Sequence, residues 1–181
     1  QKLWQQRQEL QDKYLPVGSG FKLDQFQSNL DEQTAIIEWY ITFASVETFV
    51  ITRDSLQRLN VSQQNDNLYA LIDWNNEYLR AYDEYRRDKK KTDWKDNLTS
   101  RLIHLAEILQ IEDILQLIPK TCTRIILIPH RFLHLLPLYA LPVGENHQDS
   151  DCLLDLFTGG ISYAPSCQLL QQVQKRERPN F

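Results

Sequence analysis

Short runs of apolar residues alternate with longer amphipathic segments along the chain. Residues 34–42 and 46–52 are rich in β-branched and aromatic side chains and lie a few residues apart, which predicts an antiparallel hairpin. Residues 56–61 alternate between apolar and polar side chains, so we expect a third strand there. Apolar runs at 124–128 and 160–164 are each followed by helix-like sequence, as in a parallel sheet. The pattern predicts an α/β fold in which a hairpin and helices lead into the first parallel strands of a sheet.

Helical periodicity accounts for most of the remaining sequence. We expect a short helix over 22–30 and a long helix from Asp66 to about Arg87. From Trp94 to Gln110 the apolar residues form one stripe, which predicts a single amphipathic helix. Further helical segments are expected at 112–118, around 132–141 and from about residue 167 onward.

The first twenty residues differ from the rest. Residues 1–14 carry apolar side chains at helical spacing, and Pro16 with the glycines that follow then interrupts the pattern. We interpret residues 1–20 as the end of an upstream helical, repeat-like region with its linker, and residues 21–181 as the start of a separate domain. The chain begins with Gln1 and contains no Met, so we expect it to be a piece of a longer protein.

Composition and charge exclude several classes of protein. The net charge of −4 argues against a nucleic-acid-binding surface, which needs an excess of clustered Lys and Arg. No apolar run approaches the roughly 20 residues that span a bilayer, and no signal peptide is visible. The three cysteines are widely spaced and form no C-x-x-C pair, so we expect reduced thiols in a cytoplasmic protein. The basic residues 86–91 are interpreted as a solvated loop between two helices.

Two histidines follow the predicted strand 124–128. His130 and His134 are four residues apart, as in zinc-binding helices, but the Glu of H-E-x-x-H and a nearby third ligand are missing. We therefore expect no metal site, and nothing in the sequence indicates a cofactor. His130 and Arg131 directly follow the carboxyl end of a predicted parallel strand, where ligand pockets open in α/β sheets. They are candidate substrate-pocket residues, with Arg131 able to hold an acidic group; the alternative is a solvated pair at a strand end.

Cys167 is the cysteine whose position is most suggestive. It follows Ser166, a residue type that caps helices, and would occupy the first turn of the predicted helix, where thiol pKa values fall. No His lies close to it in the sequence, so we favour a buried structural cysteine over a nucleophile.

Three sequence blocks, in this order, resemble the CHAT family of caspase-like domains that are attached to tetratricopeptide repeats. The first is the hairpin Ala35–Arg53 with its Thr52-Arg53-Asp54 turn. The second is Ile125–Pro142, a strand followed by Pro, a short turn, Leu-His-Leu-Leu-Pro and a Leu-Pro ending. The third is Ile161-Ser162-Tyr163-Ala164-Pro165-Ser166, followed by two leucines. Together the blocks span about residues 23–175.

The resemblance implies a cysteine peptidase of the caspase and separase clan, whose His–Cys dyad lies at the carboxyl ends of adjacent parallel strands. In the family both residues follow later strands, so they would fall beyond Phe181 and this chain is expected to hold no catalytic residue. The implied role is the N-terminal portion of a CHAT-type domain, which supports the dyad and is inactive alone.

The resemblance also implies partners. These are a protein or peptide substrate, the C-terminal half of the same domain and the upstream helical repeats, with neither nucleic acid nor membrane among them. The alternative is a non-catalytic CHAT-like interaction module, coupled to the repeats through residues 1–14. The sequence leaves both interpretations open.

Overall fold

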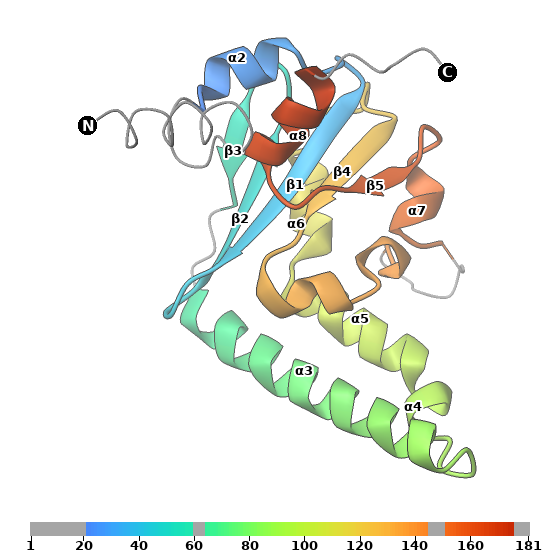
Figure 1. The fold of residues 1–181 in the computed structure, drawn as a ribbon. Coiled ribbons are helices and arrows are strands. Elements are labelled where there is room, and N and C mark those ends of the chain that lie inside the picture. Colours follow the sequence, from blue (N-terminus) through green and yellow to red (C-terminus); the bar gives the residue numbers. More distant parts are fainter. Residues whose placement is uncertain (1–20, 60–63, 145–150, 176–181) are drawn as a thin grey trace, which may run out of the picture.

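A computed structural model describes residues 21–59, 64–144 and 151–175, and its centre is a five-stranded mixed sheet (Figure 1). The strand order is β3-β2-β1-β4-β5. β1, β4 and β5 run parallel, whereas β2 is antiparallel to β1 and to β3. The strands are β1 (Thr34–Ile41), β2 (Val46–Ile51), β3 (Leu56–Arg58), β4 (Arg124–Ile128) and β5 (Ile161–Tyr163). The predicted α/β fold, hairpin and parallel strands are confirmed.

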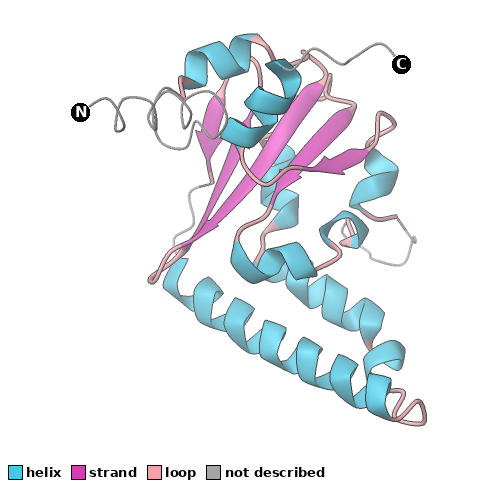
Figure 2. Cartoon of the chain, in the orientation of Figure 1, coloured by secondary structure: helices cyan, strands magenta, loops and turns pink. Residues whose placement is uncertain are grey.

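Helices cover both faces of the sheet (Figure 2). α2 and α8 pack on one face, and α3, α5 and α6 on the other. The helices are α2 (Leu23–Ser28), α3 (Gln64–Arg87), α4 (Asp93–Asp96), α5 (Leu98–Ile108), α6 (Ile111–Gln116), α7 (Leu153–Leu156) and α8 (Cys167–Lys175), with 3-10 helices η1 (Arg131–Leu135) and η2 (Leu138–Ala140). None of the helices in these described ranges is long and apolar enough to cross a bilayer.

The central strands explain why the core has two sides. Along β1, Ala35, Ile37 and Trp39 are buried in the larger cluster with α3, α5 and α6. Ile36, which points to the opposite face, is buried with Phe26 of α2. A strand covered on both faces is expected to be almost continuously apolar, and this is the run seen in the sequence.

Two expected helices have a different form in the structure. The single helix expected from Trp94 to Gln110 is divided into α4 and α5 at Asn97. The Asn97 side-chain amide donates hydrogen bonds to the Asp93 carbonyl (3.2 Å) and to the Asp93 carboxylate (2.8 Å). Such local side-chain bonds compete with the helical backbone pattern, which a stripe of leucines does not reveal.

The helix expected around 132–141 is instead two 3-10 helices, η1 and η2. Pro137 lies between them and has no N–H to continue a helix, and Leu136 before it is extended (φ −102°, ψ 146°). The fully buried Leu133 and Leu138 anchor the two turns in the larger core.

The remaining differences are local. Arg86 and Arg87 belong to the last turn of α3, where both pair with Asp83, so only the residues after them form the expected loop. α7 was not expected from the sequence. The expected helix at 1–14, the division at residue 20, the end of the third strand and the C-terminal tail lie outside the described residues.

Candidate functional site at the carboxyl edge of the sheet

His130 lies at the carboxyl edge shared by β1 and β4. The parallel register pairs Glu38 with Ile128, so two residues further on Tyr40 and His130 come side by side. Their rings stack with centroids 4.5 Å apart and an interplanar angle of 16°. The Ile41 N–H donates a hydrogen bond to His130 Nδ1 over 3.0 Å. Through these two contacts His130 links the end of β1 to the segment that follows β4.

The surroundings of His130 favour its neutral form. Burial lowers the pKa of the imidazole below its usual range, and the nearby charges of Arg131 and His134 lower it further. A ring nitrogen that accepts a hydrogen bond carries no proton, so the neutral ring holds its proton on Nε2. The chemistry left to His130 is that of a hydrogen-bond donor at Nε2.

Arg131 begins η1 with a left-handed backbone (φ 54°), and its side chain is exposed. Within the described part of the chain no ion pair involves it. The two candidate pocket residues therefore differ, because His130 is fixed by contacts to β1 while Arg131 extends into solvent at the same edge.

His134 does not share a site with His130. The segment between them is a 3-10 helix with about three residues per turn, so positions four apart do not face the same way. His134 instead borders a cavity of about 500 Å³ between η1 and the α3 residues Tyr78, Leu79 and Tyr82. Among the described residues, no group of three or more His, Cys, Asp or Glu side chains is placed to hold a metal ion.

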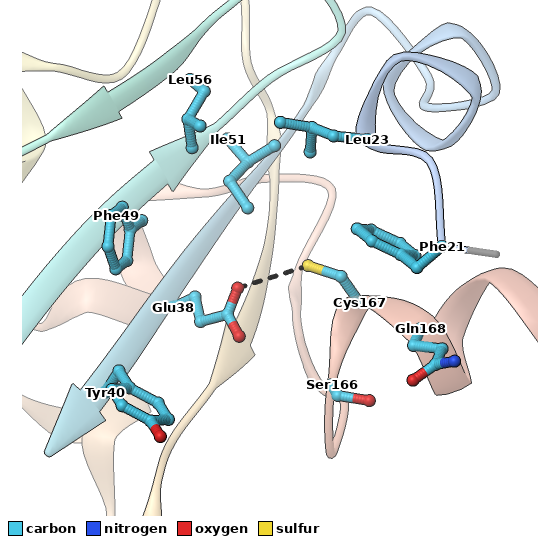
Figure 3. A pocket seen from close by; sticks show the side chains of 10 residues that line it. All are labelled: Phe21, Leu23, Glu38, Tyr40, Phe49, Ile51, Leu56, Ser166, Cys167 and Gln168. Atoms are coloured by element: carbon cyan, nitrogen blue, oxygen red, sulfur yellow. Dashed lines mark hydrogen bonds between the residues drawn. The ribbon is translucent and has the colours of Figure 1, made fainter. Parts of the chain in front are cut away.

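A second feature is a cavity on the face of the sheet that α2 and α8 cover, which we call the Glu38 cavity (Figure 3). Its volume is about 390 Å³. β1 and β2 provide its floor, and α2 and the first turn of α8 border it. The lining residues are Phe21, Leu23, Glu38, Tyr40, Phe49, Ile51, Leu56, Ser166, Cys167 and Gln168.

Glu38 and Cys167 meet inside this cavity. The Cys167 thiol donates to Glu38 Oε2 with a sulfur–oxygen distance of 3.5 Å (Figure 3). Burial raises the pKa of the Glu38 carboxyl, and the bond from Cys167 offsets part of that rise. Burial, the Glu38 charge and the same hydrogen bond raise the pKa of the Cys167 thiol far above its usual range.

These contacts decide whether Cys167 is a nucleophile or a buried structural cysteine. Ser166 does cap α8, since the Leu169 N–H donates to Ser166 Oγ over 3.2 Å. Burial and the carboxylate outweigh the effect of the helix N-terminus, however, and the thiol stays protonated. The expectation of a buried cysteine is confirmed, and no hydrogen bond joins any cysteine to a histidine within the described residues.

Sequence reasoning missed Glu38. The available signal was its position as the one charged residue in the apolar run 34–42. In a strand buried on both faces, such a residue must either reach solvent or face a polar partner. Which of these it does depends on Cys167, which is 129 positions away along the chain.

The chain matches no protein-family model and no curated protein. Its function is therefore inferred from its fold and from the groups at the carboxyl edge.

Proposed function

We propose that this chain is the N-terminal portion of a CHAT-type caspase-like cysteine peptidase domain. In this role it supports a His–Cys dyad that follows Phe181 in the parent protein, and it is inactive alone. Its partners are then the C-terminal half of its own domain, the upstream helical repeats and a peptide substrate.

The observation that carries the proposal is the open edge of β5. Among the described strands, β5 pairs with β4 alone. The Gly160 carbonyl accepts from Ile125 (3.1 Å) and the Ala164 N–H donates to Leu127 (2.9 Å), so the even-numbered positions bond toward β4. Strand alternation then directs the N–H and C=O groups of Ile161 and Tyr163 to the open side. A further strand can pair there and extend the sheet.

The direction of the strands supports the same proposal. β1, β4 and β5 are parallel, so their carboxyl ends meet at one edge, where open α/β sheets bind ligands. Further parallel strands beyond β5 would end at the same edge as His130 and Arg131. A dyad carried by them would lie on the side of the sheet where Arg131 is exposed.

The cysteines of this chain fit a supporting role. The pKa values of Cys122, Cys152 and Cys167 are all raised above the usual range, chiefly by burial. A nucleophilic cysteine needs the opposite shift. The nucleophile of a peptidase with this N-terminal half would therefore come from another part of the protein.

The test compares the parent protein with the 181-residue chain. The parent sequence beyond Phe181 is read for a strand ending in His-Gly and a later strand ending in Cys, and hydrolysis of a peptide library is measured. We expect the parent to be active, replacement of the downstream cysteine by alanine to abolish activity, and C167A to leave it unchanged. The chain alone should be inactive until the separately produced C-terminal half is added. A parent that lacks the His–Cys pair, or that stays active without that cysteine, contradicts the proposal.

A second candidate is a non-catalytic CHAT-like interaction module. It is favoured by exposed apolar side chains at helical spacing on α3, namely Tyr69, Ile72, Leu79 and Tyr82. Helical repeats of the parent are the partner that this candidate requires. An inactive parent in which Y69S together with L79S separates the repeats from the domain would favour it.

A further inference from the structure

We propose that the Glu38 cavity binds an organic cation on an apolar stem, with the ammonium or guanidinium group paired to the Glu38 carboxylate. This inference concerns binding alone and does not depend on the parent being a peptidase.

The charge that lines the cavity is negative. Among the described residues that line it, Glu38 alone has a formally charged side chain, and none is Lys or Arg. Within the described residues Glu38 forms no ion pair. The partly buried Glu38 carboxylate loses part of its hydration, and the Cys167 thiol replaces only some of it. A bound cation would supply further compensation. The same charge excludes phosphates and carboxylic acids.

The walls suit the uncharged part of such a ligand. Leu23, Ile51 and Leu56 offer aliphatic surface, while Phe21, Phe49 and Tyr40 offer aromatic rings (Figure 3). Alkyl stems pack on aliphatic surface, and cations are attracted to aromatic faces. The volume of about 390 Å³ lies within the range of roughly 300–1,000 Å³ for small-molecule pockets.

The hydrogen bond from Cys167 leaves room for the cation. A carboxylate has two oxygens and about four acceptor positions, and the thiol uses one of them, on Oε2. A cation can therefore pair with Glu38 while the thiol bond persists. Tyr40, which is half exposed, stands at the solvent side of the cavity and is held there by its stacking on His130.

Two sources share this chemistry: the Lys or Arg side chain of a peptide, and a free alkyl amine. Binding is followed by NMR on the 181-residue chain, using the Glu38 side-chain carboxyl signal and the backbone amides around it. N-acetyl-arginine amide and N-acetyl-lysine amide represent a peptide, agmatine and n-butylamine represent free amines, and the neutral N-acetyl-citrulline amide is the matched control ligand. Tighter binding of the acetylated amides identifies a peptide as the source, and tighter binding of the amines identifies a small molecule.

We expect N-acetyl-arginine amide to bind at least about tenfold more tightly than the citrulline analogue, as for other desolvated ion pairs. E38Q should remove that advantage. E77Q should keep it, because Glu77 is exposed on α3 and its replacement makes the same change in net charge. Equal binding of arginine and citrulline ligands, an unchanged affinity in E38Q, or the absence of binding by every cation overturns the proposal.

A measurement on the unmodified protein keeps the test decisive if E38Q does not fold. Lowering the pH protonates Glu38 and removes the charge that the cation pairs with. The affinity for n-butylamine, which carries its charge throughout this range, must then fall as the Glu38 carboxyl signal titrates. An affinity that stays constant through that titration contradicts the proposal.

Discussion

Replacing His130 tests whether its ring stabilises the carboxyl edge of the sheet through its contacts with β1. His130→Ala removes the acceptor of the Ile41 N–H (3.0 Å) and the ring stacked on Tyr40. Ile41 is only 2% exposed, so its amide loses its partner in a largely dry environment. Leaving a buried donor unpaired costs about 1–3 kcal/mol, and an aromatic pair contributes about 0.5–1.5 kcal/mol. We expect the free energy of unfolding to fall by about 2–3 kcal/mol, as measured by urea denaturation at neutral pH.

Further variants separate the two contacts. His130→Phe keeps a stacked ring but has no acceptor, so it should lose the hydrogen-bond part alone. A double-mutant cycle of H130A with Tyr40→Leu should give a coupling energy of about 0.5–1.5 kcal/mol for the stacked pair. The matched control is His134→Ala, because His134 is exposed and its replacement should change stability by less than about 0.5 kcal/mol.

The pH dependence of the free energy of unfolding gives an independent test of the structural role of His130. The pKa of His130 in the folded chain lies below its ordinary value of 6.5, first because of burial and then because of Arg131 and His134. Between the two pKa values the unfolded chain binds more protons than the folded chain, so stability rises with pH in this window. The contribution of the neutral His130 ring to stability is complete above pH 6.5 and is lost as the pH falls through the folded pKa of His130. His130→Phe should remove this part of the acid destabilisation.

One pattern of results refutes the reasoning. If H130A and H130F stay within about 0.5 kcal/mol of the unmodified chain, like H134A, then the bond to Ile41 contributes nothing measurable. His130 would then be free to serve as a pocket residue, which is the role that the sequence suggested.

Three further predictions concern neighbouring parts of the molecule. Because burial raises the folded-state pKa of Glu38, the contribution of Glu38 to stability is present below the ordinary carboxyl pKa of 4.5 and is lost as pH rises through the folded pKa. Glu38→Gln should flatten that decline in urea denaturation between about pH 4 and pH 8, and an unchanged slope contradicts this. Leu133→Ala should lower the free energy of unfolding by about 2–5 kcal/mol because Leu133 is fully buried. Replacement of the exposed Leu135 by Ala should lower it by less than about 0.5 kcal/mol. Similar losses in the two variants would mean that Leu133 does not anchor η1 in the core. At Gly159 an added Cβ would lie 2.8 Å from the Thr123 carbonyl oxygen, so Gly159→Ala should lower Tm by about 3 °C or more, and an unchanged Tm would contradict this.

The strands could be predicted from the sequence because each has a local signature. β1 and β4 are buried on both faces over most of their length, so their residues form almost continuous apolar runs. The division at Asn97 could not be predicted in this way. The leucines of α5 keep their helical spacing past the break, and the deciding bonds to Asp93 come from one polar side chain. Apolar periodicity reports which face is buried, and it does not report where the backbone turns.

The site could be predicted only in part, for a related reason. His130 and Arg131 follow a strand end, and that position alone placed them at the carboxyl edge. The Glu38 cavity is assembled from residues of β1, β2, β3, α2 and α8, which are far apart in the sequence. A single charged residue in an apolar run indicates that some polar partner exists, but it cannot indicate which one.

The protonation of Cys167 and the proposed role of Glu38 depend on the same hydrogen bond. Its place in the first turn of α8 favours a thiolate, yet burial and Glu38 at 3.5 Å keep the thiol protonated. The same bond gives the ionised carboxylate one donor and leaves its other acceptor positions for the proposed cation. An arrangement that prepares Glu38 to bind a cation therefore prevents Cys167 from acting as a nucleophile. In the proposed peptidase, the thiolate would therefore come from strands added at the open edge of β5, and the role proposed for the Glu38 cavity is binding.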